Sequence, residues 1–167
     1  MAKTSTFDVT SEVDLQEVDN ALNQARKEIS QRYDFKGATA EIDYDKAQGT
    51  LTLLADDEYK LDALLDILKS KLIKRGVPIR NLDYGEVHQA FGGKARQRIT
   101  LVQGISTEKG KEIVKAIKAA GFKKVNAQIQ DEQVRVSSPS IDELQAVIAA
   151  LRKEDFGIEL SFGNFRS

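Results

Sequence analysis

The sequence contains no cysteine, only one histidine and only two prolines among its 167 residues. The absence of cysteine excludes disulfides, thiolate metal ligands and cysteine nucleophiles. With His88 as the lone histidine, the familiar zinc ligand sets cannot be assembled. We therefore expect no metal and no other cofactor, and we expect His88 to be incidental rather than a general base.

Long hydrophobic runs are also missing. No apolar stretch approaches the roughly 20 residues that cross a bilayer, and the first residues lack the apolar core of a signal peptide. Hydrophobic residues nevertheless make up 41% of the chain and charged residues 31%, which is typical of a globular domain with a substantial core. We therefore expect a cytoplasmic protein.

Charge of the two signs is unevenly spread, although the net charge is only −1. Residues 1–92 contain 12 Lys and Arg against 17 Asp and Glu, whereas residues 93–167 contain 13 against 9. Between residues 94 and 124, only Glu108 and Glu112 oppose nine basic residues. An anionic partner would therefore meet the second half of the chain, although a Lys-rich helix can equally be a solvated surface.

Hydrophobic periodicity predicts helix–hairpin–helix twice along the chain. The first expected helix covers residues 15–29 after the N-cap Asp14, and the second begins after Asp56-Asp57 and stops at Gly76. The third has its apolar residues between Gly110 and Ala120 and ends at Gly121, and the fourth covers residues 141–151, with Ser140 and Glu143 spaced as in a capping box. The expected strands cover residues 6–10, 38–44, 50–55, 79–84, 96–102, 124–130, 133–137 and 157–162. This order predicts an α+β protein of two tandem ferredoxin-like (βαββαβ) units, each an antiparallel sheet with both helices on one face. The units are expected at 1–90 and 91–167, joined by residues 85–94.

Signals for catalysis are weak. The clustered carboxylates, such as Asp43 with Asp45, lie at expected turns and helix starts, where capping explains them. The stretch "GISTEKGK" from Gly104 resembles a phosphate loop, but its spacing is one residue too long and Glu112 stands where Ser or Thr is required. We expect Ser106 or Thr107 to begin a helix that contains Gly110.

The second expected hairpin predicts a polar sheet surface. Strand alternation turns Gln128, Gln130 and Arg135 away from the core, which gives a surface rich in hydrogen-bond donors. The corresponding surface of the first unit carries Glu41 and Asp43, which repel phosphate. RNA-recognition domains have a similar sheet topology and stack bases on aromatic residues of the sheet surface. Neither surface here presents such aromatic residues, so the similarity to those domains is one of topology alone.

Several motifs resemble the YajQ family. They are "FDVTSEVDLQEVDNAL", "RYDFKG" at Arg32–Gly37, "LLDILKSKLIKRG", "IQDEQVRVSSPSIDELQAVIAALR" and the tail "SFGNFR". The resemblance spans nearly the whole chain. It implies a bacterial cytosolic protein of two ferredoxin-like units that may exchange their N-terminal strands, so that residues 5–12 pair with the second unit.

The resemblance also implies a function. Family members are described as nucleotide-binding proteins with affinity for purine nucleotides and RNA, and some resemble cyclic di-GMP receptors that act on transcription. No catalytic activity is implied. This chain departs from the family at Asp131-Glu132 and Ser137–Ile141, where members commonly carry Gly and a basic cluster. Phosphate contacts from that loop are therefore not expected.

The motif "RYDFKG" has two interpretations. In one, Tyr33 packs under the helix end and Phe35 fills the space beside the hairpin. In the other, Phe35 stacks on a base while Arg32 and Lys36 hold phosphates. We expect Tyr33 to be packed and Lys36 to be exposed. At the C-terminus we expect Phe162 to be buried and Arg166 to be free.

Three functions remain open. The first is non-catalytic binding of a purine nucleotide, cyclic di-GMP or RNA by a basic surface of the second unit, where Lys111, Lys115 and Lys118 share one helix face. The second is a protein-interaction module or transcriptional co-regulator that binds no nucleotide directly. The third, an enzyme acting on nucleotides, has the least support. The candidate binding residues are Arg32, Phe35, Lys36, Lys111, Lys115, Lys118, Gln128, Gln130, Arg135 and Arg166.

Overall fold

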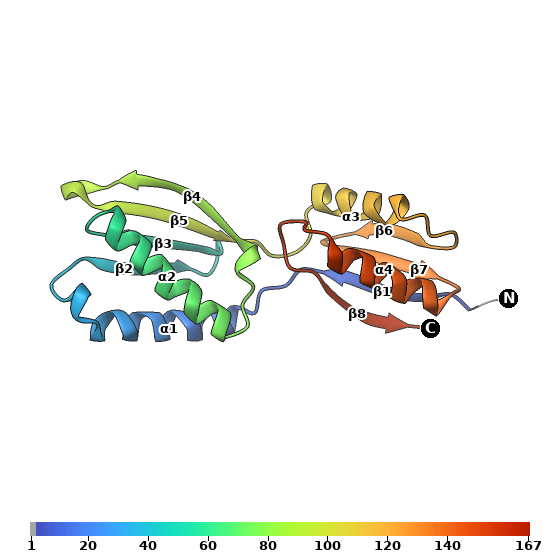
Figure 1. Ribbon diagram of the computed structural model, residues 1–167, viewed down its shortest axis with the longest axis horizontal. Helices are drawn as coiled ribbons and strands as arrows, with labels where there is room; N and C mark the ends of the chain where they lie inside the picture. The colour runs from blue at the N-terminus through green and yellow to red at the C-terminus, as the bar shows by residue number, and fades with distance from the viewer. Residues whose placement is uncertain (1–2) are drawn as a thin grey trace. The chain divides into compact units, whose positions relative to one another are not determined.

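The computed structural model describes residues 3–167, and the first two residues of the expected first unit lie outside them. The chain divides into two compact units. The inserted unit is Val13–Val102, and the split unit consists of Gln103–Ser167 together with the segment before Val13. Each unit has one four-stranded antiparallel sheet and two helices (Figure 1). The predicted α+β class with two ferredoxin-like units is confirmed.

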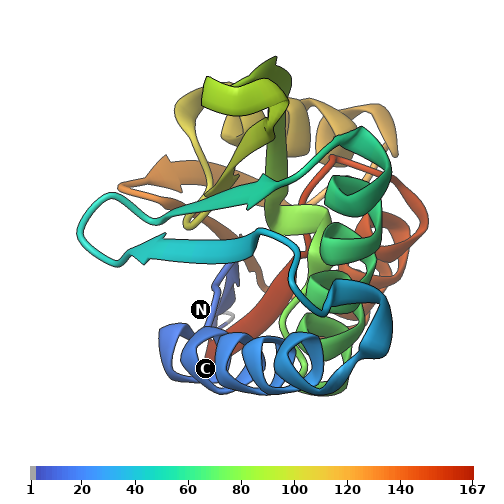
Figure 2. The ribbon, with the colours of Figure 1, turned by 90° about the vertical axis from the view of Figure 1, so that its left-hand side faces the viewer.

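The inserted unit has both of its helices on one face of its sheet (Figure 2). The strands lie in the order β2-β3-β5-β4, so β3 and β5 are central. Its elements are α1 (Leu15–Gln31), β2 (Ala40–Asp45), β3 (Thr50–Ala55), α2 (Glu58–Lys74), β4 (Leu82–Gln89) and β5 (Ala95–Leu101).

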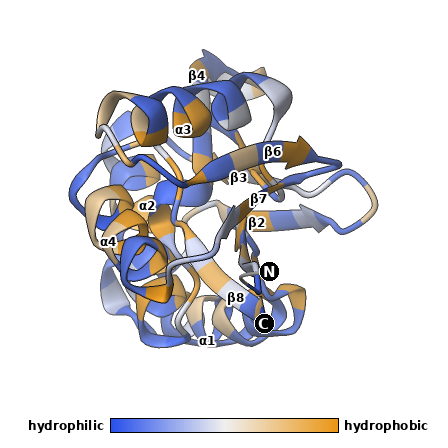
Figure 3. Cartoon of the chain, turned by 90° about the vertical axis from the view of Figure 1, so that its right-hand side faces the viewer, coloured by the Kyte–Doolittle hydropathy of each residue, from blue (hydrophilic) through white to orange (hydrophobic). Residues whose placement is uncertain are grey.

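The split unit has the strand order β6-β7-β1-β8, which places the N-terminal strand in the middle of its sheet. Phe7 and Val9 of β1 lie opposite Val136 and Val134 of β7 in the core. Helices α3 and α4 each carry hydrophobic and hydrophilic residues along their length (Figure 3). The buried side chains include Ile113 and Ile117 of α3 and Leu144, Val147, Ile148 and Leu151 of α4, whereas Ile141 at the start of α4 is exposed. The elements are β1 (Ser5–Thr10), α3 (Thr107–Ala119), β6 (Asn126–Gln130), β7 (Gln133–Ser138), α4 (Ile141–Lys153) and β8 (Ser161–Arg166).

The boundary between the units differs from the one expected after residue 90. The strand expected to open the second unit is β5, which pairs with β3 and β4 of the inserted unit. It supplies the strand that a βαββαβ unit normally has at its start, whereas β1 supplies that strand to the split unit. Hydrophobic alternation marks a strand without identifying its partner, so periodicity alone could not locate this boundary.

Strand β4 also begins and ends later than expected. It covers the first half of the stretch expected to join the units, and a short 3-10 helix at Ile79–Asn81 replaces the start of the expected strand. A register shift between Tyr84 and Val87 marks a bulge. The side-chain amide of Gln97 donates to the carbonyl oxygen of Gly85 at 2.9 Å, and a Cβ on Gly85 would lie 2.7 Å from the Arg98 carbonyl oxygen. Only glycine fits this close strand approach without a backbone shift.

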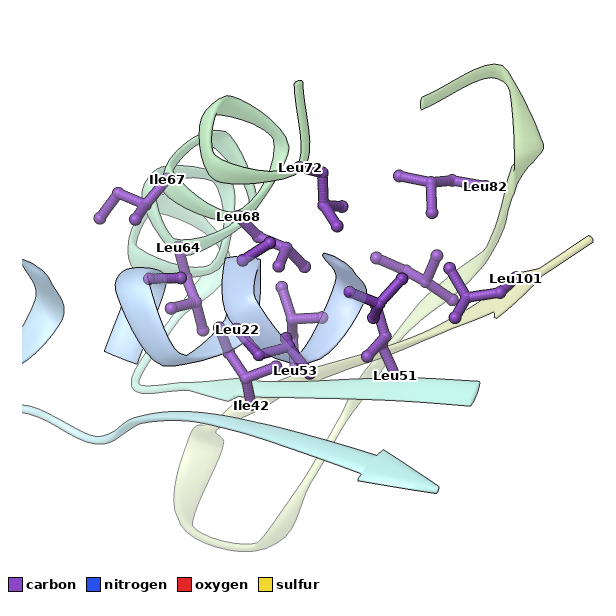
Figure 4. Packing of buried hydrophobic residues seen from close by; sticks show 14 of the residues in the cluster. Leu22, Ile42, Leu51, Leu53, Leu64, Ile67, Leu68, Leu72, Leu82 and Leu101 are labelled. Carbon is purple, nitrogen blue, oxygen red and sulfur yellow. The ribbon is translucent and has the colours of Figure 1, made fainter. Parts of the chain in front are cut away.

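The core of the inserted unit lies between its two helices and its sheet. Leu64, Leu68 and Leu72 of α2 point toward Leu51 and Leu53 of β3, and all five side chains are completely buried (Figure 4). The leucine spacing of α2 places these side chains on one helix face, and the alternation in β3 places its leucines on one sheet face.

Three helices begin at the residues that the sequence predicts. The Asp14 carboxylate accepts hydrogen bonds from the backbone N–H groups of α1 at Gln16 and Glu17. The hydroxyls of Ser106 and Ser140 cap α3 and α4 in the same way. These caps satisfy N–H groups that have no partner within the helix. Across residues 3–167, every helix is too short or too polar to span a bilayer.

Candidate functional site

The segment Arg32–Gly37 joins the end of α1 to the start of β2. Arg32 is extended and ends the helix, and Tyr33–Phe35 forms a single 3-10 turn. Gly37 has a φ of 76°, a value that favours glycine, and it turns the chain toward β2. The motif is therefore a sharp connection whose side chains project from a short, well-defined backbone.

The two aromatic residues of this segment lie in opposite environments, one exposed and one buried. Tyr33 is 88% exposed, so the expected packing of Tyr33 under the helix end is wrong. Phe35 is 4% exposed and fills the space beside the hairpin. In a 3-10 turn, neighbouring side chains point in different directions, so one aromatic ring faces the core while the other faces solvent. A base would meet the Tyr33 ring and not the Phe35 ring.

Two cations lie against the buried Phe35 ring. The guanidinium carbon of Arg32 is 5.4 Å from the ring centroid, and the Lys60 ammonium from α2 is 5.2 Å from it. The same ammonium donates a hydrogen bond to the carbonyl oxygen of Asp34. These contacts fix the backbone of the turn, and with it the direction in which Tyr33 projects.

Arg32 is not a free cation. Its Nε and Nη2 atoms lie 3.0 Å and 2.8 Å from the two carboxylate oxygens of Asp34, and Nη1 lies 3.4 Å from Glu28. These hydrogen bonds from Arg32 hold the pKa of Asp34 below its usual value. Glu28 is shared with Lys71 of α2 at 2.9 Å. By contrast, Lys36 is exposed, as expected, and has no ion pair within residues 3–167.

A surface pocket of about 640 Å³, here called the motif pocket, lies beside this segment. Three basic side chains line it, from Arg26, Arg32 and Lys36, and no acidic side chain does. Small ligands commonly occupy pockets of about 300–1,000 Å³. The other lining residues are Ile29, Ser30, Gln31, Tyr33, Phe35, Gly37, Ala38 and Ala40.

The lysines predicted on α3 do share an exposed surface. Lys111, Lys115 and Lys118 are all exposed, and none forms an ion pair within residues 3–167, whereas Lys109 contacts Glu112 at 3.3 Å. The excess of positive charge in the second half is lost once the units are divided as the structure divides them. The inserted unit contains 14 basic and 15 acidic residues, and the split unit contains 11 of each. The basic character is local to α3 and the loop after it.

The glycine of the apparent phosphate loop has a structural explanation. Gly110 is buried inside α3, as predicted, and a Cβ there would lie 3.1 Å from the Ile129 side chain of β6. The glycine therefore allows the helix to approach the sheet closely, which leaves the motif without a phosphate role.

The polar face of the split sheet contains Gln128, Gln130, Arg135 and Arg166, with Gln128 directly opposite Arg135. Arg135 is already paired, because its Nε atom lies 2.9 Å from the carboxylate of Asp8, which is 3% exposed. The hydrogen bond from Arg135 holds the pKa of Asp8 below its usual value. Arg166 is exposed, as expected. Phe162 is half-buried rather than buried, with the Arg152 guanidinium 5.4 Å from its ring centroid.

A basic stripe on the inserted sheet was missed in the sequence. Arg96 and Arg98 of the central strand β5 are exposed on the face away from the helices, opposite Leu54 and Thr52 of β3. The tip of the β4–β5 hairpin carries Phe91, which is 98% exposed. The expected domain boundary placed Arg96 and Arg98 in the second unit, apart from their neighbouring strands β3 and β4. Their position on the inserted sheet was therefore not predicted.

No group of three or more His, Asp or Glu side chains among residues 3–167 could hold a metal ion. The described residues present three groups of cations. One lines the pocket beside the exposed Tyr33 ring, one is the exposed set of lysines on α3, and one is Arg96 with Arg98, which share their sheet face with Glu41 and Asp43 of β2. This arrangement can bind a phosphorylated ligand through stacking and charge.

Comparison with known proteins gives one consistent result. A sequence profile described as "Nucleotide-binding protein YajQ-like" matches residues 5–166. A protein of Syntrophotalea carbinolica is 56% identical over 161 residues, covering 96% of this chain and 98% of its own. Relatives from Geotalea uraniireducens (54% over 160 residues, 96% and 98%) and Bacillus cereus (53% over 166 residues, 99% and 100%) are similarly close. All three are named as nucleotide-binding proteins, and their names state no reaction.

Proposed function

Because the chain belongs to the YajQ-like family of nucleotide-binding proteins, we propose that it binds a nucleotide in the motif pocket without altering it chemically. The observation that best supports this proposal is that an exposed aromatic ring, Tyr33, lies beside a pocket lined by three basic residues and no acidic one. Bases need a flat ring and phosphates need cations, and both are supplied within one short segment.

The base stacks on Tyr33. Stacking on an aromatic side chain contributes about 1–3 kcal/mol per base and tolerates any base, because every base has a π-face. A purine has the larger ring system and gains more from this contact. The cations against Phe35 support the stacking indirectly, since they hold the turn on which Tyr33 is carried.

The phosphates meet Lys36 first, because it is exposed and has no ion pair within residues 3–167. Arg26 and Arg32 line the same pocket, and Arg26 also donates a hydrogen bond to the carbonyl oxygen of Ile42. Since ion pairs at an open surface are screened by salt, affinity should fall as ionic strength rises.

Substituting the exposed ring and the exposed lysine separately should distinguish the contribution of base stacking to the affinity from the contribution of charge. We expect Tyr33→Ala to weaken binding of a purine nucleotide about tenfold, the lower part of the range for one stacked base, and Lys36→Gln to weaken it several-fold while reducing its salt dependence. Titration calorimetry with mono-, di- and cyclic nucleotides, including cyclic di-GMP, at two salt concentrations measures both effects.

Matched controls exist on the same unit. Tyr59 is 80% exposed on α2 and Lys27 is exposed on α1, and neither lines the pocket. Tyr59→Ala and Lys27→Gln should leave affinity within about twofold of the unchanged protein, the usual scatter of surface substitutions. Equal losses in the pocket variants and the controls would show that the nucleotide binds elsewhere.

RNA is a second candidate ligand, favoured by the exposed lysines of α3 and by the stripe of Arg96 and Arg98. We expect replacement of Lys111, Lys115 and Lys118 by glutamate to weaken binding of a short single-stranded RNA at least tenfold at low salt, since each lost phosphate contact lowers the salt slope by about 0.7. The comparison variant is Arg96→Gln with Arg98→Gln. A loss only in the comparison variant would place the RNA on β5, and unchanged binding in both would exclude both surfaces.

The fully exposed Phe91 favours a different class of function, a protein-interaction module. Large aromatic side chains are enriched among the anchors of protein interfaces. This alternative predicts that the pure protein binds none of the nucleotides in the panel, so the same titration distinguishes it from the proposal above.

A further inference from the structure

We propose that the open face of the inserted sheet, the face away from α1 and α2, docks against the same face of a second copy of this chain. The two copies are related by a twofold axis that runs along the central strand β3. The inference does not depend on the proposed nucleotide function, because none of the residues that carry it lines the motif pocket.

Charges of opposite sign lie on separate strands of this face. The edge strand β2 carries Glu41 and Asp43, and β5 carries Arg96 and Arg98, with β3 between the two strands (Figure 1). All four residues are exposed, and none of them forms an ion pair within residues 3–167. The face therefore holds two acidic and two basic groups that are free to pair with another molecule.

The strand register sorts these charges into two rows across the sheet, each with one carboxylate, one residue of β3 and one arginine. The members are Glu41, Leu54 and Arg96 in one row, and Asp43, Thr52 and Arg98 in the other. Neighbouring strands lie about 4.8 Å apart. In each row, the carboxylate and the arginine are therefore displaced from β3 by the same amount in opposite directions.

This pattern is complementary to itself under a twofold axis along β3, midway between two stacked sheets. The rotation exchanges the two sides of β3 and preserves the position along the strand, so β2 of one copy faces β5 of the other. Glu41 then meets Arg96 of the second copy, and Asp43 meets Arg98 of the second copy. Because a twofold contact is reciprocal, the same residues form these pairs a second time, which gives four ion pairs.

The middle of the face is compatible with this approach. Leu54 and Thr52 are half-buried and meet their own counterparts on the axis. Packed sheets stand about 10 Å apart with their strands within about 30° of each other, a gap that a glutamate and an arginine from opposite sides can bridge. In the next row, Asp45 faces Thr100 of the second copy, so that row adds no contact between like charges.

Charge complementarity favours a second copy over a nucleic acid on this face. A phosphate backbone would be attracted by the two arginines but repelled by the two carboxylates beside them. A second copy pairs all four charges. Exposed ion pairs are individually weak and are screened by salt, so the dimer should be weak and sensitive to ionic strength.

The test uses the full chain and two variants of opposite charge. Glu41→Lys with Asp43→Lys reverses the acidic side, and Arg96→Glu with Arg98→Glu reverses the basic side. Sedimentation velocity should show a dimer of the unchanged protein whose dissociation constant rises at least about tenfold between about 0.1 M and about 1 M salt. Each variant alone should dimerise at least about tenfold more weakly, because repulsion replaces attraction in all four pairs.

An equimolar mixture of the two variants provides the second readout. The introduced lysines then face the introduced glutamates, and the native arginines face the native carboxylates. The mixed dimer should therefore be at least as tight as the dimer of the unchanged protein, a rescue that also shows that both variants are folded. The control is Asp62→Lys with Asp66→Lys, which makes the same change of charge at two exposed residues of α2. It should leave dimerisation within about twofold.

Three results would overturn the proposal. They are an unchanged protein that remains monomeric at about 1 mM, an equal loss of dimer in the α2 control, and a mixture of the two variants that remains monomeric. A monomeric protein that binds a short single-stranded RNA, and loses this binding in Arg96→Glu with Arg98→Glu, would assign the face to nucleic acid instead.

Discussion

Leu68→Ala is expected to lower the free energy of unfolding of the inserted unit by about 3–5 kcal/mol, the range for truncating a leucine in a packed core. Leu68 is completely buried between α2 and the sheet, among side chains from both helices and from β3 (Figure 4). The substitution removes three carbon atoms, Cγ and the two methyl groups, and leaves a cavity in the packed core. Denaturant unfolding followed by circular dichroism measures the loss.

Ile73→Ala on the same helix is the control. Ile73 is 57% exposed, so its truncation should cost less than about 1 kcal/mol. Similar losses for the two variants would show that α2 does not pack on the sheet through its leucine face. If the two units unfold separately, the transition of the split unit should not move in either variant.

The second large effect concerns the pair of Asp8 and Arg135 in the split unit. Asp8 accepts hydrogen bonds from Arg135 Nε at 2.9 Å and from the Asn164 amide at 2.6 Å, and it is nearly inaccessible to water. Asp8→Ala should lower stability by about 2 kcal/mol, as for hydrogen bonds to a charged group. Arg135→Met should cost more than this at pH 7, because it leaves the buried carboxylate without its cation.

The pH dependence of this pair follows from the direction of the pKa shift. The hydrogen bond from Arg135 lowers the pKa of Asp8 in the folded state from its ordinary value of 3.8. Its contribution is therefore fully present above about pH 4 and is lost as the pH falls through the lower folded value. Asp8→Ala should remove this part of the acid destabilisation, which unfolding curves between pH 2 and 7 would show.

Glu12→Ala is the matched control, since Glu12 is an exposed carboxylate of the same unit. It should change stability by less than about 0.5 kcal/mol at any of these pH values. An Asp8→Ala variant as stable as Glu12→Ala would mean that the pair is not formed in solution.

Local structure was predictable from the sequence because its causes are local. The leucines of α2, the alternation in β3 and the caps at Asp14, Ser106 and Ser140 each follow from residues a few positions apart. The partner of β5 was not predictable in this way. Its pairing with β3 is specified by surfaces that meet only in the folded unit, and the domain boundary shifted with it.

The sequence indicated the segment Arg32–Gly37 as a candidate site, but it gave only part of the geometry of its side chains. Lys36 is exposed as expected. Which aromatic ring faces solvent depends on the direction of one 3-10 turn, which alternation does not give. The ion pair between Arg32 and Asp34 could have been predicted, because residues two apart on a turn can contact each other. It was missed because charges were counted over whole segments and not residue by residue.

The position of β1 has a consequence for the order of events during synthesis. This strand leaves the ribosome before the other described strands, whereas its neighbours β7 and β8 follow all strands of the inserted unit, and the Arg135–Asp8 contact joins residues 127 positions apart. The inserted unit contains every strand of its own sheet and can fold while the rest is still being made. The nascent chain must therefore carry an unpaired hydrophobic strand, "STFDVT", through most of translation, a period in which a chaperone can bind it.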